Sequence, residues 1–247
     1  MAKQFKPETL CVQAGWTPKK GEPRVLPIYQ STTFKYDTSE QMARLFDLED
    51  SGYFYTRLQN PTNDAVAAKI AALEGGVAAM LTSSGQAANF YAIFNICQAG
   101  DHFVCSSAIY GGTFNLFGVT MKKLGIDVTF VSPDASEEEI SAAFRPNTKC
   151  LFGETISNPS LEVLDIEKFA RIAHRNFDWE AHAEKFPGLC TPDESYHGLT
   201  YSKAFGKGAY ITKATAQLMR DLGSIQSPQN AFLLNLGLET LHLRMPQ

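Results

Sequence analysis

Short apolar runs alternate with amphipathic helical repeats along the middle of the chain, and this alternation constrains the fold more than any other sequence feature. The apolar runs predict strands at residues 77–82, 102–106, 128–131 and 149–154. Between them, apolar residues recur three or four positions apart, which is the spacing of a helix with one buried face. The sequence therefore predicts an α/β fold with a mainly parallel sheet and helices on both of its faces.

Local signals indicate where several helices begin and end. A helix is predicted to start at Asn60-Pro61 and to end at Gly75-Gly76, and Ser136 with Glu139 forms the capping box of another. Further helices are predicted at residues 39–48, 86–97, 114–124, 166–173, 211–222 and 228–245. The length of the chain is enough for one large domain or for a domain with an appendage.

The turn Ser83-Ser84-Gly85-Gln86 joins the strand predicted at 77–82 to the following helix. Its unpaired backbone N–H groups would lie at a helix N-terminus, where the helix dipole favours a phosphate. A Ser-Gly cap is also common in ordinary α/β loops, so the turn alone leaves both interpretations open. Parallel sheets bind ligands at the carboxyl ends of their strands. Residues 83–86, 106–112 and 154–158 follow three of these ends, which favours the phosphate interpretation.

The first 60 residues carry four prolines and many aromatic side chains but only one helix signal, at residues 39–48. Such a segment cannot build a core of its own, yet it is too aromatic to be disordered. We expect an N-terminal arm that docks on another surface. That surface is either a second subunit or the rest of its own domain.

Composition excludes several classes of protein. The 247 residues are 44% hydrophobic with a net charge of −4 and no run of basic residues, which argues against a nucleic-acid surface or an anionic-membrane patch. No stretch is apolar enough to cross a bilayer, and no secretion leader is evident, so the cytoplasm is the expected location. The five cysteines are scattered without a Cys-x-x-Cys pair, so we expect buried reduced thiols, no disulfide framework and no metal site.

Six motifs in order resemble the Cys/Met-metabolism family of pyridoxal-phosphate (PLP) enzymes. They are Tyr55-Thr56-Arg57, Asn60-Pro61-Thr62, Leu73-Glu74-Gly75-Gly76, Ser83-Ser84-Gly85-Gln86-Ala87-Ala88, Tyr110-Gly111-Gly112-Thr113 and Glu154-Thr155-Ile156-Ser157-Asn158-Pro159. The resemblance covers nearly the whole chain, and residues 186–198 are similar to the O-acetylhomoserine sulfhydrylase branch of that family. It implies a fold-type I, aminotransferase-like large domain that binds PLP.

The resemblance also implies a division of the chain. Residues 1–60 would be an arm that contributes to a neighbouring subunit's site, and residues 61–226 would be the PLP-binding large domain. Residues 227–247 would begin the helix that leads to a C-terminal domain not represented here. The implied assembly is a homo-oligomer, a tetramer built from dimers that share active sites.

For the cofactor phosphate, the resemblance implies two groups of residues. Ser84, Gly85 and Gln86 would bind it at the helix N-terminus, chiefly through backbone N–H groups. Tyr55 and Arg57 would reach the same phosphate from the neighbouring subunit. A phenol and a guanidinium on alternate positions suit such a role, since Arg forms charge-assisted hydrogen bonds with phosphate.

For the cofactor ring, the resemblance implies three residues. Tyr110 would stack on the pyridine ring and act as a catalytic residue by assisting proton transfer when the γ group leaves. Asn158 would hydrogen-bond the 3′ oxygen of the ring, and Glu154 would lie close to the cofactor. An aromatic face suits a flat ring, and an amide suits a phenolate oxygen.

The chain departs from the family at two essential positions. It has neither the lysine motif that attaches PLP covalently nor the strand Asp that pairs with the ring nitrogen, and solvated surface positions are predicted for Lys168, Lys185, Lys203, Lys207 and Lys213. The strand and helix rhythm also breaks at Asn176-Phe177, where we place an apparent gap. We therefore expect a longer protein than the 27.2 kDa of this sequence. A true internal deletion, which would be catalytically dead, is the alternative.

The implied reaction is γ-replacement on O-acetyl-L-homoserine, in which sulfide or a small thiol displaces acetate to give homocysteine or methionine. A methionine or cystathionine γ-lyase and a cystathionine γ-synthase of the same family are the enzymatic alternatives. A PLP-fold scaffold without activity is the non-enzymatic one. The sequence has no P-loop, no Gly-x-Gly-x-x-Gly turn and no Gly-x-Ser-x-Gly elbow, which argues against NTPases, dinucleotide enzymes and α/β hydrolases.

Overall fold

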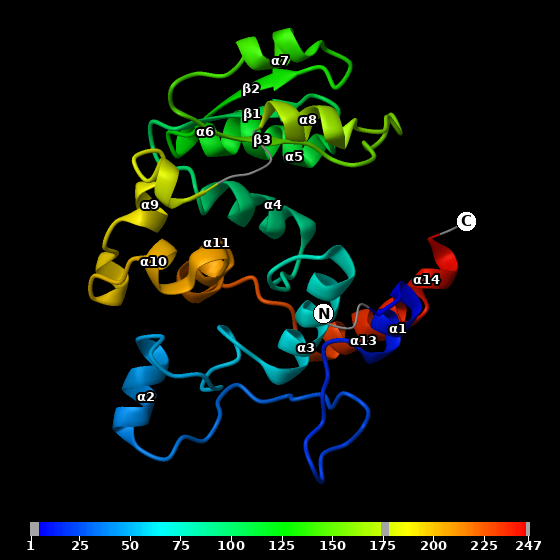
Figure 1. Cartoon of the computed structure of the whole chain (residues 1–247), viewed down its shortest axis with the longest axis vertical. Helices are drawn as coiled ribbons and strands as arrows, with labels where there is room; N and C mark the ends of the chain where they lie inside the picture. The colour runs from blue at the N-terminus through cyan, green and yellow to red at the C-terminus, as the bar shows by residue number, and fades with distance from the viewer. Residues whose placement is uncertain (1–4, 174–177, 246–247) are drawn as a thin grey trace. The chain divides into compact units, whose positions relative to one another are not determined.

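The computed structural model describes residues 5–173 and 178–245 (Figure 1). The chain divides into two compact units, which we call the helical unit (Met1–Gly85 with Asp193–Gln247) and the sheet unit (Gln86–Pro192). Each unit is described by itself below. The predicted break at Asn176-Phe177 lies outside the described residues.

The described residues of the sheet unit form three strands and several short helices. Its elements are α4 (Gly85–Phe94), β1 (His102–Ser106), α5 (Gly111–Asn115), the π-helical η1 (Leu116–Thr120), α6 (Met121–Lys123), β2 (Asp127–Val131), α7 (Glu137–Ala142), β3 (Thr148–Phe152), α8 (Ile166–Ile172), η2 (Glu180–His182) and α9 (Pro187–Cys190). The strand order is β2-β1-β3, and both pairings are parallel. The predicted parallel α/β sheet is therefore confirmed, and the capping box of Ser136 and Glu139 is formed at α7.

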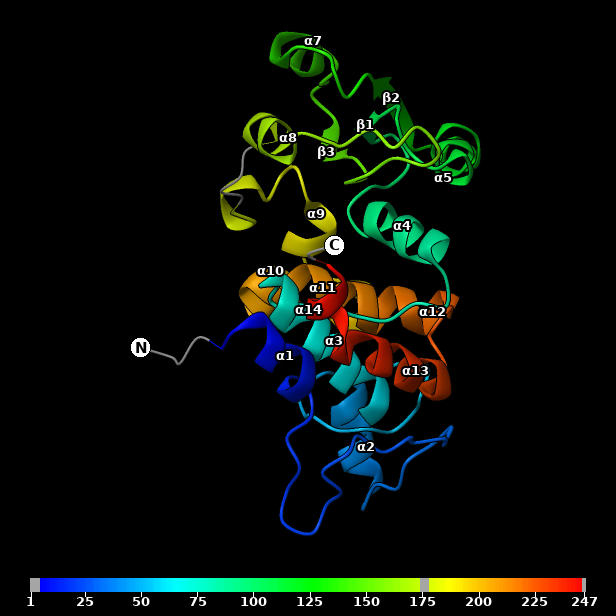
Figure 2. The ribbon, with the colours of Figure 1, turned by 90° about the vertical axis from the view of Figure 1, so that its right-hand side faces the viewer.

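Helices cover both faces of this sheet, with α5 on one side and α7 and α8 on the other (Figure 2). Successive side chains of a strand point to opposite faces, so the apolar residues of β1 serve two layers. Phe103 and Cys105 pack with Phe117 and Met121 in one fully buried cluster. The rings of Phe103 and Phe117 meet edge to face at 5.1 Å. Ile140 and Phe169 are the buried residues of α7 and α8.

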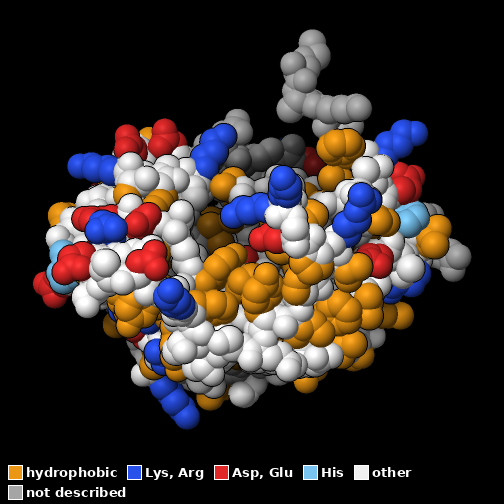
Figure 3. All heavy atoms as spheres, turned by 90° about the horizontal axis from the view of Figure 1, so that it is seen from below, with side chains coloured by type: hydrophobic (Ala, Val, Ile, Leu, Met, Phe, Trp, Pro, Cys, Tyr) orange, Lys and Arg blue, Asp and Glu red, His pale blue; other side chains and the backbone are white. Residues whose placement is uncertain are grey.

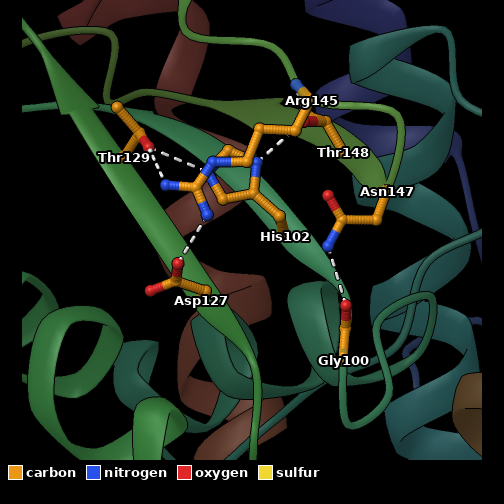
Figure 4. Close-up of polar contacts among 7 residues, drawn as sticks. All are labelled: Gly100, His102, Asp127, Thr129, Arg145, Asn147 and Thr148. Carbon is orange, nitrogen blue, oxygen red and sulfur yellow. Dashed lines mark hydrogen bonds and ion pairs between the residues drawn. The ribbon is translucent and has the colours of Figure 1, made fainter.

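A polar cluster joins the amino ends of the three strands (Figure 4). The buried imidazole of His102 contacts the hydroxyl of Thr148 through Nδ1 at 2.7 Å and that of Thr129 through Nε2 at 2.9 Å. Arg145 donates to Thr129 at 3.2 Å and to the Asp127 carboxylate at 2.6 Å. Burial and the nearby Arg145 charge lower the pKa of His102, so the neutral ring is favoured. Each polar atom of the ring has a partner, and this end of the sheet is closed.

The helical unit contains helices from both ends of the chain. Its elements are α1 (Pro7–Gln13), α2 (Ser39–Phe46), α3 (Pro61–Glu74), η3 (Glu194–Tyr196), α10 (Tyr201–Phe205), η4 (Gly206–Gly208), α11 (Ala209–Lys213), the π-helical η5 (Ala214–Met219), α12 (Arg220–Leu222), α13 (Pro228–Glu239) and α14 (Leu241–Arg244). The single helix predicted at 228–245 ends at Glu239, and Thr240 separates it from α14. Ala231 of α13 is buried in a small core with Leu26 and with Ala65 and Val66 of α3.

Part of the N-terminal arm packs on its own unit. Asn60 caps α3 by accepting from the Thr62 backbone at 3.0 Å, and its amide donates to the carbonyl of Tyr29 at 2.9 Å. The Thr62 hydroxyl donates to the carbonyl of Pro27 at 2.8 Å. These bonds hold residues 27–29 against the start of α3. For this part of the arm, the structure shows docking within the same chain.

The strand predicted at residues 77–82 was wrong. These residues form no named strand, and the one pairing found in this segment is an isolated bridge between Thr82 and Ile225. Val77 is 66% exposed rather than buried. A strand is stabilised by its neighbours, and no strand of the described chain pairs with residues 77–81. The apolar pattern was recognised correctly, but the described residues of this unit contain no sheet that would bury it.

Candidate active site

The phosphate turn leads directly into α4. Gly85 is the first residue of this ten-residue helix, and Ser84 and Gly85 are exposed. A side chain added at Gly85 would meet no atom within 4 Å, so the space in front of the first turn is open. The first N–H groups of a helix have no partner within the helix. The turn therefore offers donors and a favourable dipole to an anion such as phosphate.

Gln86 connects the first turn of α4 to a second loop of the sheet unit. Its Oε1 accepts a hydrogen bond from the Thr113 hydroxyl at 2.9 Å, and Asn89 donates to that hydroxyl at 3.0 Å. Thr113 lies in α5 and is fully buried. Thr113 belongs to the motif Tyr110-Gly111-Gly112-Thr113, but the sequence alone predicted no role for it. The sequence signal that could have indicated a structural role for this threonine is its position directly after Gly111-Gly112, in the first turn of a helix.

Tyr110 and Glu154 meet beyond the carboxyl ends of β1 and β3. The Tyr110 backbone N–H donates to Oε2 of Glu154 at 3.1 Å, whereas the Tyr110 side chain is 49% exposed. A Cβ at Gly112 would lie 2.5 Å from the Tyr110 ring, so only glycine lets the ring adopt this position. Burial raises the pKa of the Cys105 thiol, and the Glu154 charge raises it further. Glu154 therefore positions the tyrosine loop and adds negative charge at the end of β1.

Asn158 lies on an exposed turn at the same side of the sheet unit. Ser157 is buried beneath it, donates its backbone N–H to Glu162 at 2.9 Å and accepts from Leu161 at 3.1 Å. Ile156 and Val163 form a bridge that closes this turn. The turn fixes the backbone on both sides of Asn158 and leaves its position open to solvent.

Tyr55 and Arg57 belong to the helical unit. Tyr55 forms a bridge with Thr33, and the Thr56 backbone donates to Thr32 at 2.8 Å, so this stretch is held in place by the arm. The Arg57 guanidinium carbon lies 5.2 Å from the centre of the Tyr55 ring, within cation–π distance. Arg57 is exposed, so its charge is available to a ligand or a neighbouring chain.

Three of the five lysines predicted at surface positions, Lys168, Lys185 and Lys213, are only partly exposed. Lys168 donates to the carbonyls of Pro133 at 2.6 Å and Ala135 at 3.1 Å, so its ammonium group is engaged. Lys213 is half-buried, and burial lowers its pKa. Surface positions had been predicted because none of these lysines has the motif that attaches PLP. Lys203 and Lys207 are exposed as predicted.

Other kinds of site find no support in the described part of the chain. Within residues 5–173 and 178–245, no group of three or more His, Cys, Asp or Glu side chains could hold a metal ion. In the same ranges, no helix has the length and apolarity needed to span a bilayer. All five cysteines are free thiols, and Cys11, Cys97 and Cys105 are buried.

Comparison with known proteins gives a consistent result. A family model described as Cys/Met metabolism PLP-dependent enzyme matches residues 8–178. An O-acetyl-L-homoserine sulfhydrylase of Corynebacterium glutamicum is 39% identical, with 99% of this chain and 68% of that protein aligned. A homocysteine/cysteine synthase of Kluyveromyces lactis is 37% identical over 96% of this chain and 65% of that protein. This chain thus spans about two thirds of the length of these relatives.

Solved structures show the same likeness. A Campylobacter jejuni protein named as an O-acetylhomoserine (thiol)-lyase, solved with a pyridoxyl-lysine phosphate, has a TM-score of 0.88 and 30% identity, covering 97% of this chain and 72% of that one. A cystathionine γ-lyase of Lactobacillus plantarum has a TM-score of 0.72 and 28% identity, covering 97% of this chain and 65% of that one. The fold-type I architecture expected from the sequence agrees with these neighbours.

The alignments also contain positions that this chain lacks. The alignment with the K. lactis protein has 290 positions, whereas 96% of the 247 residues is about 237, so about 53 positions have no residue of this chain. The C. glutamicum alignment has 298 positions against about 245 residues, which again leaves about 53.

Proposed function

Because this chain belongs to the Cys/Met metabolism PLP-dependent enzymes, we propose that its activity is γ-replacement on O-acetyl-L-homoserine. Sulfide or a small thiol takes the place of the acetoxy group, giving homocysteine or methionine and releasing acetate. The names of the most similar curated proteins support this choice of substrate. The structural observation that best supports this reaction is the hydrogen bond from the Tyr110 backbone to Glu154. It joins the loops that follow the carboxyl ends of β1 and β3.

PLP is the cofactor of this family, and the residues present suit its phosphate and its ring. The open first turn of α4 offers N–H groups at Gly85 and Gln86, with Ser84 beside them. The bonds from Gln86 to Thr113 keep this turn in a fixed relation to the loop of Tyr110. When bound, PLP supplies the electron sink that labilises bonds at the α and β carbons of the substrate.

Tyr110 has two roles in this proposal. Its exposed ring offers an aromatic face to the cofactor, and its phenol assists proton transfer as the acetoxy group leaves Cγ. Asn158 donates from its amide to the ring oxygen of the cofactor, and Glu154 keeps the Tyr110 loop in place. Tyr55 and Arg57 bind the phosphate of a neighbouring subunit's cofactor, in a tetramer of dimers that share active sites.

Covalent attachment of PLP needs a lysine in a setting that this sequence does not provide. We propose that the lysine and the Asp for the ring nitrogen belong to a segment at the junction 176/177. The 53 alignment positions without a residue of this chain support a segment that this sequence lacks, and the break in the strand and helix rhythm supports its position at 176/177. The large domain then comprises residues 61–226 and is interrupted at that junction. A second domain follows the helix that begins at residue 227.

Product analysis of the protein purified from its source tests the activity. Incubation with O-acetyl-L-homoserine and sulfide should give homocysteine, whereas methionine alone should give no 2-oxobutyrate. The variant Tyr110→Phe keeps the ring and loses the hydroxyl, so we expect turnover to fall by about 100-fold with cofactor content unchanged. Tyr36→Phe, at a tyrosine that is 41% exposed, is the matched control and should have full activity.

Two other outcomes would contradict the proposal. If methionine gives 2-oxobutyrate and O-acetyl-L-homoserine with sulfide gives no homocysteine, the protein is a γ-lyase, which the likeness to the L. plantarum structure already makes the nearest rival. If the native protein has a mass of 27.2 kDa and turns over neither substrate, the segment is deleted and a scaffold role is favoured.

A further inference from the structure

A cavity of about 650 Å³ lies in the helical unit, where the N-terminal arm meets its helices. Its wall is formed by the end of α1, by residues 16–26 of the arm, by α3 and by α13. These three helices lie side by side in both ribbon views (Figures 1 and 2). The volume suits a small organic molecule, because ligand cavities usually measure about 300–1,000 Å³. The described lining includes none of the residues proposed to bind PLP.

This lining is basic, although the chain as a whole is acidic. Its charged side chains are four cations and two carboxylates, namely Lys19, Lys20, Arg24, Lys69, Glu22 and Glu239. The whole sequence has a net charge of −4. On the face of the molecule drawn in Figure 3, basic and acidic side chains are interspersed around hydrophobic ones, so that face is not generally basic. The excess of positive charge in this cavity therefore favours an anionic ligand.

Both carboxylates of the lining are engaged within the chain, whereas the cations are not. Glu22 accepts a hydrogen bond from the Lys19 backbone through Oε2 at 2.7 Å, and Glu239 accepts from the Asn235 amide through Oε1 at 3.2 Å. No hydrogen bond or ion pair joins any of the four cationic side chains to another residue that the structure describes. Their charges are therefore available to a ligand.

Lys69 of α3 is the strongest indication of a ligand. It is only 3% exposed, and lysines are almost never buried this deeply unless they are paired. Burial lowers the pKa of its ammonium group, while the charge of Glu239 favours the protonated form. A buried cation is costly unless an anion and hydrogen-bond acceptors surround it. A phosphate or carboxylate group in the cavity would supply both.

The arm is held closely against α3 beside this lysine. Gly15 has a φ of +88°, and a Cβ there would clash with the carbonyl oxygen of Ala65 and lie 3.0 Å from the backbone nitrogen of Lys69. Only glycine therefore allows this approach. The Trp16 indole N–H donates to the carbonyl of Pro23 at 3.0 Å and closes the loop that follows. The apolar part of the lining consists of Val12, Ala14, Trp16, Pro18, Val25 and Leu26.

We propose that this cavity is a second binding site, which takes a small organic anion with an apolar body. Lys69 and the cationic side chains of the arm bind the phosphate or carboxylate group of the ligand, and the apolar lining around Trp16 packs against its body. The site does not depend on the proposed reaction, because it shares no residue with the candidate active site.

Titration calorimetry of the complete protein tests this inference. The protein is first saturated with PLP, so that the phosphate turn at Gly85 is occupied. The probe is phenyl phosphate, which joins a dianionic group to an aromatic body, and we expect one saturable site per chain. Benzyl alcohol has a similar body without the charge, and inorganic phosphate has the charge without the body. Each should bind at least tenfold more weakly than phenyl phosphate.

Tryptophan fluorescence locates the complex. Trp16 lines the cavity, whereas Trp179 belongs to the sheet unit. Binding of phenyl phosphate should therefore change the intrinsic fluorescence of the parent protein and of the matched control Trp179→Phe. The variant Trp16→Phe should lose this change.

Two charge variants identify the groups that bind the anion. Lys69→Met keeps the length of the side chain and removes its charge, so the affinity for phenyl phosphate should fall at least tenfold. Arg24→Gln alters an exposed residue, so the fold should be retained, and the affinity should fall at least threefold. Lys203→Met is the matched control, since Lys203 is exposed and lies outside the lining, and its affinity should equal that of the parent.

Four results would overturn the inference. They are absence of a saturable site, equal binding of either comparison compound, a fluorescence change that persists in Trp16→Phe, and an affinity that neither Lys69→Met nor Arg24→Gln lowers. Failure to form homocysteine from O-acetyl-L-homoserine would count only against the proposed reaction, because the binding measurements need no turnover. The two proposals therefore fail separately.

Discussion

Strand β1 in the sheet unit and residues 77–81 in the helical unit are both apolar runs that the sequence marks as buried strands. β1 has a parallel neighbour on each side, and all five of its residues are buried. Residues 77–81 have no paired neighbour within the described chain, and Val77 is 66% exposed. Residues 77–81 also contain two alanines, which are depleted in strands, whereas β1 contains Phe103 and Val104. The comparison shows that available neighbours, together with local propensity, decide whether an apolar stretch becomes a core strand.

The largest expected effect comes from truncating one side chain in each run. Phe103→Ala empties a site in β1 that is fully buried against Phe117 and Met121, and should lower the free energy of unfolding by about 3–5 kcal/mol. Val77→Ala should change it by less than about 0.5 kcal/mol, because the side chain is already largely in water. Urea unfolding of both variants provides the measurement. Equal losses would mean that residues 77–81 are packed as a strand and that the comparison is wrong.

Sequence patterns predicted the sheet unit well because its signals are local. The capping box at Ser136 acts through neighbours a few residues away, and so does the glycine that ends α3 in the helical unit. The failure at residues 77–82 came from a partner that no local pattern describes.

The same division applies to the candidate site. Spacing correctly indicated that the turns carrying Tyr110 and Glu154 follow strand ends, whereas the strand predicted before Gly85 does not form. It gave no sign that Thr113 bonds to Gln86 or that Glu154 holds the Tyr110 backbone. Those contacts depend on side-chain placement across loops, which single-sequence patterns do not encode.

A second prediction concerns the stability contributed by a buried ion pair in the sheet unit. The ion pair of Lys149 with Asp101 has an N–O distance of 3.4 Å, and both side chains are almost fully buried. The Lys149 ammonium also donates to the carbonyl of Lys185 and lies 5.5 Å from the centre of the Phe186 ring. Lys149→Met leaves the Asp101 carboxylate buried without its cation, so stability should fall by about 3 kcal/mol. Adding Asp101→Asn to this variant should recover most of the loss, and no recovery would show that packing, not charge, dominates.

Asp64 of α3 is a carboxylic acid whose removal should stabilise the folded chain at high pH. Burial raises its pKa to about 6, so the folded chain binds a proton that the unfolded chain has already lost. The stability contributed by this group is present below pH 4 and is lost as pH rises through about 6. Asp64→Asn should therefore stabilise the chain at pH 8 by about 2 kcal/mol and have little effect at pH 4. Thermal unfolding at the two pH values measures this, and a destabilised variant at pH 8 would contradict the assignment.

Substitution of His102 should have the smallest of these effects on stability. Its pKa is lowered in the folded chain, so between that value and the unfolded value of about 6.5 the unfolded chain binds more protons. Stability should then fall as the pH drops below about 6.5. His102→Gln can still hydrogen-bond Thr129 and Thr148 but does not titrate, so the loss of stability between pH 7 and pH 5 should be smaller in this variant. An unchanged pH dependence would show that His102 is not the titrating group.

Hydrogen exchange of the 247-residue chain, with and without pyridoxine 5′-phosphate, tests the account most directly. This ligand carries the phosphate and the ring of PLP but has no aldehyde, so it cannot react with lysines. We predict slowed exchange at the amides of Gly85 and Gln86 and in the loop of Tyr110, with residues 77–81 fast and β1 slow under both conditions. Unchanged exchange at Gly85 and Gln86 with protection elsewhere, or residues 77–81 as slow as β1, would contradict it.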